Sequence, residues 1–573
     1  MKKNFFVKLF GLTILMFTLL FTGALAETYE GTGYGYDKDG IVLDVEIKDS
    51  KITDVKVKRA KESEFATPAI QEIAKKVIAT QSLDVDGISG ASLTSEGTKE
   101  AIEEAVKKSG ITLTTVTVQN VRTVEFPKET DVVVIGAGGA GLTSAIAAHE
   151  KGAKVILIEK TELLGGNTNY ATAGLNAAGT KIQEKLGVKD SPELFYEDTM
   201  KGGKNKNNKE LVRVLVNNSS AIVDWLIERG ADLSELTSTG GQSAKRTHRP
   251  TGGTAVGPNI VAALSKTAEN EKIDIRKGTK AIALVKTKNR IVGVKVREID
   301  GKEYTIKAKA VIVATGGFGA NAKMVEKYNP KLKGFGSTNN PAIVGDGIIM
   351  VEKVGGALVD MSEIQTHPTV VYNKTNMITE AVRGEGAILV NKDGKRFIDE
   401  LETRDVVSKA ILDQKGKSAF LIFDEDIRTK LKAADGYVKK GFAVEGTLEE
   451  IAAKIGTDAK TLEATLNKYN EAVRDKVDSE FNKKTLPKEL TGTKYYAIEV
   501  SPAVHHTMGG VRINTNAEVL GKNGRPIKGL YAAGEVTGGI HGANRIGGNA
   551  VADITVFGKI AGENAATYSK SVK

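Results

Sequence analysis

The sequence predicts an α/β protein in which a domain built on a parallel sheet follows a small α+β domain. Residues 131–158 contain an apolar strand, the glycine turn GAGGAG, a helix and a second apolar strand. Two later apolar strands, in KAVIVATGGFG and GLYAAGEV, also end in glycines, so they are expected to extend the same sheet. Residues 27–110 instead alternate apolar and polar residues and then show two amphipathic helical patterns.

The N-terminus, residues 1–26, has the pattern of a targeting segment. Three lysines precede an uncharged apolar run that starts at Leu9, and Ala24 and Ala26 fit a small-residue cleavage site. This pattern predicts export by a cleaved signal peptide and therefore a secreted or cell-surface protein. The apolar run also has about the minimum length of a membrane span, so an uncleaved anchor is the alternative.

The composition excludes several classes of protein. None of the 573 residues is cysteine, which excludes disulfides, Cys-ligated iron–sulfur clusters, C-x-x-C-H haem attachment and a lipoprotein anchor. The formal net charge is +10, but the lysines and arginines are spread along the chain without interleaved aromatic residues. This distribution favours surface solubility, or attraction to an anionic cell envelope, over nucleic-acid binding.

Residues 27–110 are predicted to form the small α+β domain. Its first half alternates apolar and polar residues between Gly and Asp-Gly turns, which favours β-hairpins. The segments 66–81 and 95–110 have apolar residues at helical spacing, so each is expected to be a helix. Between them lies DVDGISGASLTSEG, residues 84–97, which is too short and too apolar for a flexible linker. Residues 111–130 are expected to connect this domain to the next.

The glycine turn has the spacing G-x-G-x-x-G at Gly136, Gly138 and Gly141. It follows an apolar strand and opens a helix, and Glu159 ends the next strand about twenty residues further on. The first glycine allows a tight turn, the second lets the backbone approach a pyrophosphate, and Glu159 can accept hydrogen bonds from ribose hydroxyls. This context predicts a dinucleotide site rather than a chance glycine turn.

Charged chemistry is expected where histidines and arginines occur among glycines and prolines. His149 falls on the helix after the glycine turn and is expected to be structural, whereas the other five histidines lie in AKRTHRPTGG, EIQTHPTV, SPAVHHTMGG and GGIHGANRIGG. Glu380, Arg383 and Arg404 follow the second of these segments, and Arg545 lies in the last. A surface ion pair would explain any one arginine, but the group indicates a dicarboxylate or other anionic substrate. No zinc spacing, H-E-x-x-H or G-x-S-x-G occurs, so neither a metal site nor a nucleophile triad is predicted.

Ten short motifs occur between Asp131 and the C-terminus: GAGGAG, GGNTN, HRPTGG, ATGGF, GDG, HPT, TEAVRG, HHTMGG, GEVTGG and GANRIGGNA. In these motifs the chain resembles the flavoprotein subunit family of soluble fumarate reductases, especially the flavocytochrome c type. The resemblance implies non-covalent FAD in a Rossmann-like domain made of residues 131–361 and 506–573. It also implies an inserted α+β capping domain, residues 362–505, which closes over the substrate.

The resemblance also implies roles for individual residues. Arg404 in ETRD matches the proton donor of the family, with Glu380 and Arg383 as its proton relay. The substrate-binding positions are His367, Thr379, Glu380, His506, Arg545 and Gly548. The FAD-binding positions are Gly136, Gly138, Ala140, Gly141, Glu159, Asn167, Thr168, Gly174, Asp346, Glu535, Ala550 and Val551.

The stretch DGISGAS resembles the flavinylation motif of FMN-binding domains, in which FMN is carried through a phosphoester. The resemblance implies covalent FMN on Ser92, attached by a flavin transferase, with Asp86 as the motif acid. Thr94 is the alternative acceptor, and an ordinary loop between two helices is the alternative to a site. Flavocytochromes carry haems before the flavin domain, and this chain cannot, so FMN is expected to receive electrons from an external carrier or a membrane quinol system.

The expected activity is reduction of an activated alkene carboxylate, with fumarate reduced to succinate. Reductases of urocanate, acrylate, methacrylate or cinnamate are the nearest alternatives, and the presence of His367, Thr379 and Arg404 favours a dicarboxylate. A 3-oxosteroid dehydrogenase would not need these carboxylate-binding residues. A non-catalytic electron-transfer protein would keep the flavin motifs but would not need the charged set either.

Overall fold

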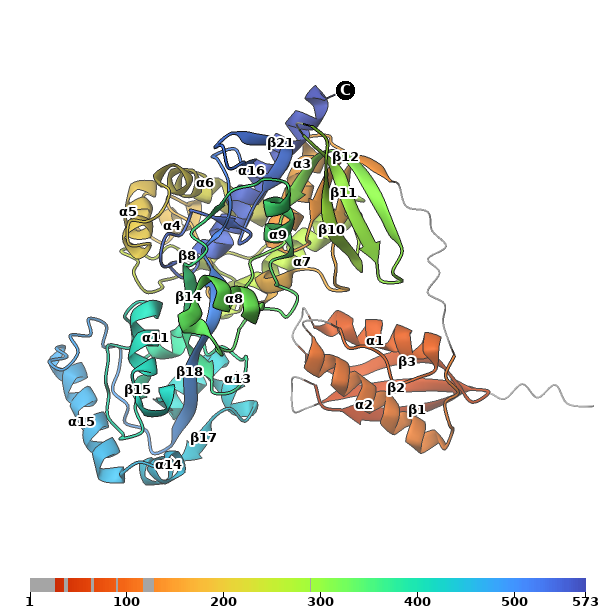
Figure 1. Ribbon diagram of the computed structural model, residues 1–573. Helices are drawn as coiled ribbons and strands as arrows, with labels where there is room; N and C mark the ends of the chain where they lie inside the picture. The colour runs from red at the N-terminus through yellow and green to blue at the C-terminus, as the bar shows by residue number, and fades with distance from the viewer. Residues whose placement is uncertain are drawn as a thin grey trace, which may run out of the picture. The chain divides into compact units, whose positions relative to one another are not determined.

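The computed structural model describes residues 26–35, 40–62, 66–88, 91–116, 128–288 and 290–572. Almost all of the predicted targeting segment lies outside these residues. The chain forms two compact units, described here one at a time (Figure 1). Within the described residues, no helix has the length and apolar character needed to cross a membrane.

The first unit is the predicted α+β domain. Its elements are β1 (Glu27–Gly33), β2 (Ile41–Lys48), β3 (Lys51–Ala60), α1 (Thr67–Thr80) and α2 (Ser92–Ser109). The strands pair antiparallel in the order β1-β2-β3, and alternate residues of β2 are buried, as its sequence pattern predicts.

Helix α2 begins earlier than predicted. The sequence indicated a helix from residue 95, but the structure extends it back to Ser92, so the last six residues of the stretch 84–97 are helical. Tertiary contacts hold the extra turn: Thr94 is buried and donates its hydroxyl hydrogen bond to Glu62, and the following turn packs on β1. A Cβ on Gly33 would meet the carbonyl oxygen of Gly97 at 1.9 Å, so these backbones lie in direct contact. Thr94 and Ser95, in the first turns, are buried as well.

The second unit is built on an eight-stranded sheet whose main order is β10-β11-β12-β4-β5-β9. Its strands are β4 (Glu129–Ile135), β5 (Val155–Ile158), β9 (Asp274–Arg276), β10 (Thr279–Lys286), β11 (Ile291–Glu298), β12 (Glu303–Val313), β20 (Glu518–Leu520) and β21 (Pro526–Ala532). β12 pairs in parallel with both β4 and β21, so the two later glycine-ended strands extend the parallel sheet as predicted. The antiparallel hairpin β10–β11 at the edge was not predicted.

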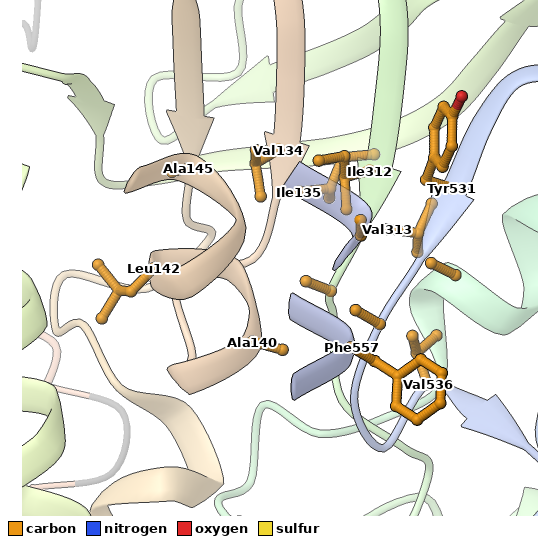
Figure 2. Close-up of a cluster of buried hydrophobic side chains, with 14 of the residues drawn as sticks. Val134, Ile135, Ala140, Leu142, Ala145, Ile312, Val313, Tyr531, Val536 and Phe557 are labelled. Carbon is orange, nitrogen blue, oxygen red and sulfur yellow. The ribbon is translucent and has the colours of Figure 1, made fainter. Parts of the chain in front are cut away.

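Helices α3 (Gly139–Glu150) and α16 (Asn549–Ser571) pack together beside this sheet. Figure 2 shows Val134, Ile312 and Phe557 in the shared apolar core. The helices meet at small residues, because a Cβ on Gly562 would lie 2.3 Å from the carbonyl oxygen of Ser144. This close packing fixes the segment before α16, which holds Arg545, relative to the glycine turn before α3.

A second buried core lies within residues 371–500. It surrounds a five-stranded sheet made of β14 (Ile364–Val371), β15 (Ile388–Val390), β16 (Ala419–Asp424), β17 (Val444–Gly446) and β18 (Tyr495–Thr507). Its helices are α10 (Glu380–Gly384), α11 (Arg404–Leu412), α12 (Glu425–Lys430), α13 (Lys432–Lys439), α14 (Leu448–Ile455) and α15 (Ala459–Asp475). β14 and β18 span the predicted limits of the capping domain, residues 362–505, and Figure 1 shows β18 leading from this sheet toward the larger one.

The remaining described elements of the second unit surround these two sheets. They are α4 (Lys181–Lys185), α5 (Pro192–Gly202), α6 (Lys209–Glu228), α7 (Val256–Asn270), α8 (Ala322–Tyr328), α9 (Asp346–Lys353), β6 (Leu175–Asn176), β7 (Glu235–Thr237), β8 (Thr247–Arg249), β13 (Leu358–Val359), β19 (Gly510–Arg512) and β22 (Thr537–Gly538). Short 3-10 turns occur at Gly166–Tyr170, Thr251–Gly253, Pro330–Leu332 and Lys415–Lys417.

A buried charge network stabilises the smaller core. Arg396 bonds Glu400 at 2.8 Å and Asp478 at 3.0 Å, and Lys483 bonds Glu400 at 2.8 Å. Arg396→Ala is expected to lower the free energy of unfolding by about 3–5 kcal/mol, because the buried carboxylate of Asp478 would lose its ion pair and Glu400 would keep only Lys483. Urea unfolding followed by circular dichroism measures this effect. The control is Arg297→Ala, which breaks an exposed pair with Glu303 and is expected to cost at most about 1 kcal/mol.

Candidate active site

One long cavity of the second unit connects the glycine turn to the arginines. Its wall contains eleven of the twelve predicted FAD-binding residues: Gly136, Gly138, Ala140, Glu159, Asn167, Thr168, Gly174, Asp346, Glu535, Ala550 and Val551. Four predicted catalytic or substrate-binding residues line the same cavity, and they are Arg404, His506, Arg545 and Gly548. The shape and chemistry of this wall fit a long dinucleotide with a polar substrate at one end.

The three glycines of the turn have different structural roles. Gly136 has φ +97°, and a Cβ there would meet the carbonyl oxygen of Ala314 at 2.6 Å. At Gly138 an added Cβ would meet its nearest atom at 3.6 Å, so the space beside this residue faces the cavity. Gly141 packs against the turn instead of lining the cavity, because its Cβ would lie 1.7 Å from the carbonyl oxygen of Gly136.

This difference predicts opposite phenotypes for two alanine substitutions. Gly141→Ala is expected to prevent stable folding of the FAD-binding domain, since a backbone oxygen cannot move aside. Gly138→Ala is expected to leave the melting temperature of the apoprotein nearly unchanged but to lower the FAD content, because the methyl group enters the space for the pyrophosphate. Flavin absorbance per polypeptide and calorimetry of the apoprotein measure both effects. Normal FAD content in Gly138→Ala would contradict the assignment of this turn to the pyrophosphate.

Polar groups along the cavity are held in place by the backbone. The carboxylate of Glu159 accepts hydrogen bonds from the N–H of Ala137 at 2.8 Å and of Thr161 at 2.9 Å. Glu535 accepts from the N–H of Thr507 at 3.0 Å and from the side-chain amide of Asn167 at 3.3 Å. Burial raises the pKa of Glu535, and these two donors lower it in part. Both carboxylates can therefore present fixed acceptors to a bound nucleotide.

Arg404, Glu380 and Arg383 form a continuous chain of charged groups. Arg404 is the first residue of α11, and its Nη2 donates to Glu380 Oε2 at 3.0 Å. The other oxygen of Glu380 lies 3.8 Å from Arg383 Nη2, one helical turn along α10. Burial alone would raise the pKa of Glu380, but Arg404 and Arg383 lower it to about 2, so this carboxylate is ionised at neutral pH.

Arg383 continues the chain into the smaller core. Its side chain is fully buried, and its Nη1 donates to the backbone carbonyl of Glu400. The carboxylate of Glu400 belongs to the charge network with Arg396 and Lys483. The charged chain is therefore attached to buried groups of the smaller core, and Arg404 is the member that lines the cavity.

The predicted histidines cluster beside the arginines. His506 lines the cavity, and within the described part of the chain neither of its ring nitrogens has a hydrogen-bond partner. Burial, together with the charge of Arg545, holds the pKa of His506 well below its usual range, so the ring is neutral and free to bind a polar ligand. His367 is buried behind the wall, with its ring centre 5.2 Å from that of His505. His505, which was not predicted as a site residue, lines the cavity and bonds Thr338 at 2.8 Å.

The other predicted substrate-binding residues, Thr379, Gly548 and Arg545, differ in their surroundings. Thr379 precedes α10, and its N–H donates to the hydroxyl of Tyr437 at 3.0 Å; it is outside the cavity wall as described. Gly548 has φ +87° and touches Asn176, so a side chain has no room there. Burial and then the charge of Arg404 lower the pKa of Arg545 to about 9.

Gln365 is a site residue that sequence reasoning missed. It lies on β14, next but one to His367, and its side chain bonds both Arg404 and Arg545. A single glutamine in EIQTHPTV carries no pattern that marks it. The role of Gln365 becomes visible only in the fold, which brings β14, α11 and the segment before α16 together.

The three remaining histidines do not line the cavity. His248 is buried between the hydroxyl of Thr180 and the carbonyl of Arg246. His541 bonds Asp553 at 3.1 Å behind the cavity, with its ring centre 5.4 Å from that of His506. His149 lies on α3, as predicted. Among the residues that the structure describes, no group of three or more His, Asp or Glu side chains could hold a metal ion.

The predicted FMN-attachment stretch is only partly described. Residues 89–90 and the side chain of Ser92 lie outside the described residues, although α2 begins at Ser92. Thr94, the alternative acceptor, is buried and donates its hydroxyl hydrogen bond to Glu62. Asp86, the motif acid, is the first residue of DGISGAS, and its backbone carbonyl accepts a hydrogen bond from Lys76 at 3.2 Å.

This arrangement of a dinucleotide cavity with a charged, polar end defines a flavin-dependent oxidoreductase. Residues 131–551 match the FAD binding domain family, and residues 35–107 match the FMN-binding domain family. The chain therefore belongs to the FAD binding domain family, in the group that contains the soluble fumarate reductases, and carries an FMN-binding domain before it.

Three curated relatives illustrate the similarity. The NADH:fumarate oxidoreductase of Klebsiella pneumoniae (strain 342) is 44% identical over 93% of this chain, and the chain spans 58% of that protein's length. The fumarate reductase (cytochrome) of Shewanella frigidimarina is 51% identical over 77% of each chain. The urocanate reductase of Eggerthella lenta is 35% identical over 96% of this chain and 93% of its own length.

Two solved structures have a fold similar to that of the second unit. The open conformation of a flavocytochrome c3 fumarate reductase matches 77% of this chain and 78% of its own, with a TM-score of 0.69 and 45% identity. A 3-ketosteroid-Δ4-(5α)-dehydrogenase from Rhodococcus jostii RHA1 matches 78% of this chain with a TM-score of 0.61 and 26% identity. The architecture is thus shared by enzymes that are named for different activities.

Proposed function

We propose that this protein reduces the carbon–carbon double bond of a small unsaturated carboxylate, and that fumarate is its substrate. One observation carries the proposal. Arg404 and Arg545 meet at the end of the FAD cavity, and Arg404 is bonded to the buried carboxylate of Glu380, which lies beside Arg383. Two cationic groups beside a flavin site suit a dianion, and the attached chain of charges suits proton delivery.

Binding and orientation of the substrate rest on residues of both cores. Arg545 and the neutral ring of His506 can hold one carboxylate of the substrate. Thr379 and His367 are proposed to help hold its second carboxylate. Bound reduced FAD supplies hydride to one alkene carbon. Fixed positive charge then stabilises the anion that develops on the substrate, without any reorganisation of the site.

Arg404 donates the proton that the second alkene carbon requires. Arginine is a very weak acid, with a pKa above about 12, so the donor must be reprotonated at once. Glu380 is ionised and directly bonded to Arg404, and Arg383 lies on its other side. A proton passed from Arg383 through Glu380 restores Arg404 and leaves Arg383 one proton short. Arg383 then takes up a proton that comes ultimately from solvent, which returns the chain to its starting charge.

Electrons are proposed to reach FAD from FMN carried on Ser92. The acceptor would be loaded by a flavin transferase, and the buried, bonded hydroxyl of Thr94 supports Ser92 over Thr94. The donor to FMN would be an extracellular carrier or a membrane quinol system, in keeping with export directed by residues 1–26.

A second candidate keeps the chemistry and changes the substrate. One relative is named a urocanate reductase and another, from Vibrio harveyi and 35% identical, an NADH:acrylate oxidoreductase. Urocanate and acrylate each carry one carboxylate, whereas fumarate carries two. Either substrate would therefore engage one cationic group fewer. The steroid dehydrogenase likeness reflects the common fold, since a steroid has no carboxylate for two buried arginines.

The test is anaerobic oxidation of reduced viologen by the purified protein. Fumarate, urocanate, acrylate and methacrylate are offered in parallel under identical conditions. Fumarate is expected to give the highest kcat/KM, by at least about tenfold, because loss of one charge-assisted contact costs about 1.5–3 kcal/mol. A higher kcat/KM for any monocarboxylate would overturn the dicarboxylate assignment.

A further inference from the structure

We propose that Gln365 is a positioning residue that holds the proton donor beside the carboxylate clamp, an inference that rests on the proposed function. Its buried Oε1 accepts a hydrogen bond from Arg404 Nη1 at 3.2 Å and another from Arg545 Nη2 at 3.0 Å. One oxygen atom therefore joins a guanidinium from α11 to a guanidinium from the segment before α16.

The other end of the amide fixes its orientation. Gln365 Nε2 donates to Asn544 Oδ1 at 2.7 Å and to the backbone carbonyl of Arg545 at 2.8 Å. A backbone carbonyl only accepts, so the nitrogen must face it and the oxygen must face the guanidinium groups. Asn544 is oriented in turn by its own bond to the carbonyl of Gly202. The amide thus has a single arrangement that satisfies all its partners.

A neutral acceptor is the appropriate group at this point. Two buried guanidinium ions that share one oxygen atom repel each other, and burial together with this repulsion lowers the pKa of Arg545. The carbonyl dipole of Gln365 offsets part of that repulsion without removing the positive charge that a dicarboxylate needs. A carboxylate in its place would also accept from both arginines, but its second oxygen would face the carbonyl of Arg545 without a donor, and its charge would compete with the substrate for the arginines.

Gln365 acts through the arginines rather than by touching the substrate. It is not among the described residues that line the cavity, whereas Arg404 and Arg545 are. Without its oxygen, the like charges are free to separate, and Arg404 moves away from the reacting carbon. Misplacement of a catalytic group by about 1 Å costs roughly a hundredfold in rate.

Two substitutions separate these effects. Gln365→Leu removes the acceptor at similar volume, and kcat for fumarate is expected to fall at least about a hundredfold with normal FAD content. Gln365→Glu keeps an acceptor but neutralises the clamp, so KM for fumarate is expected to rise at least tenfold, with a smaller fall in kcat than in Gln365→Leu. The affinity for malonate, followed by the change in FAD absorbance, is expected to weaken at least tenfold in Gln365→Glu.

Gln183→Leu is the matched control. Gln183 is equally buried and bonds Thr180, Asp190 and Lys245, so its loss reports the general cost of removing a buried amide. Its kcat, KM and malonate affinity are expected to stay within about twofold of wild type. Near wild-type kinetics in Gln365→Leu, or the same pattern in both Gln365 variants, would overturn the proposal. If wild type itself does not reduce fumarate, the proposed function falls, and the malonate titration of Gln365→Glu still decides the role of Gln365.

Discussion

Arg404→Ala is expected to lose fumarate reduction by several powers of ten while it keeps normal FAD content. The substitution removes the group that the chain from Glu380 and Arg383 supplies with protons. General acid catalysis contributes about 10²–10⁴-fold, and the loss also leaves a space that water can enter. Steady-state viologen oxidation with fumarate, with flavin content checked for each preparation, measures the effect.

Arg404→Lys is the sharper companion variant. Lysine keeps the positive charge but has a shorter reach and lacks the planar fork that bonds Glu380 and Gln365 together. It is therefore expected to lose turnover almost as completely as alanine. Near wild-type turnover in either variant would remove Arg404 from the role of proton donor.

Arg545→Ala separates substrate binding from proton transfer. Arg545 is expected to bind a substrate carboxylate both before and during the reaction, so its loss should raise KM as well as lower kcat. Arg404→Ala is expected to act mainly on kcat. If the two variants showed the same split between KM and kcat, the distinct roles assigned to the two arginines would be wrong.

The sequence was sufficient for the parts of the fold that depend on local patterns. β4, α3 and β5 follow directly from an apolar strand, a glycine turn, a helical segment and a second apolar strand, and the glycine-ended strands β12 and β21 join the same sheet. Gly141 shows the limit of the motif. It belongs to the glycine fingerprint, yet its role is to let α3 approach the turn rather than to line the cavity.

The parts that depend on long-range packing could not be predicted. The early start of α2 goes with the buried Thr94 and its bond to Glu62, which the helical pattern from residue 95 does not contain. The role of Gln365 depends on two arginines that are 39 and 180 residues away in the chain. His505 and His506 are neighbouring residues of the same type. His506 was predicted as a site residue, and only the fold shows that His505 lines the cavity as well. Sequence motifs predicted the candidate reacting groups, whereas packing shows which side chains hold them.

Ser92→Ala is expected to abolish FMN attachment completely while it leaves FAD bound and competent. Covalent attachment requires a hydroxyl, and alanine offers none, so no partial effect is expected. Mass spectrometry of protein made in cells with a flavin transferase should find FMN on the wild-type peptide that contains Ser92, and no adduct in the variant. Reduction of fumarate by viologen is expected to stay within about twofold of wild type, because the dye can reduce FAD directly.

Thr94→Ala provides the control for this last prediction. The Thr94 hydroxyl is buried and bonded to Glu62, so its removal is expected to cost about 1–3 kcal/mol in stability and to leave the adduct on Ser92. Electron transfer from the natural donor should fail in Ser92→Ala alone, since FMN is its proposed route to FAD. An adduct found at Thr94, or an unmodified wild-type peptide from cells with an active transferase, would show that Ser92 is not the acceptor. Loss of FAD together with FMN would show that the two flavin sites do not load independently.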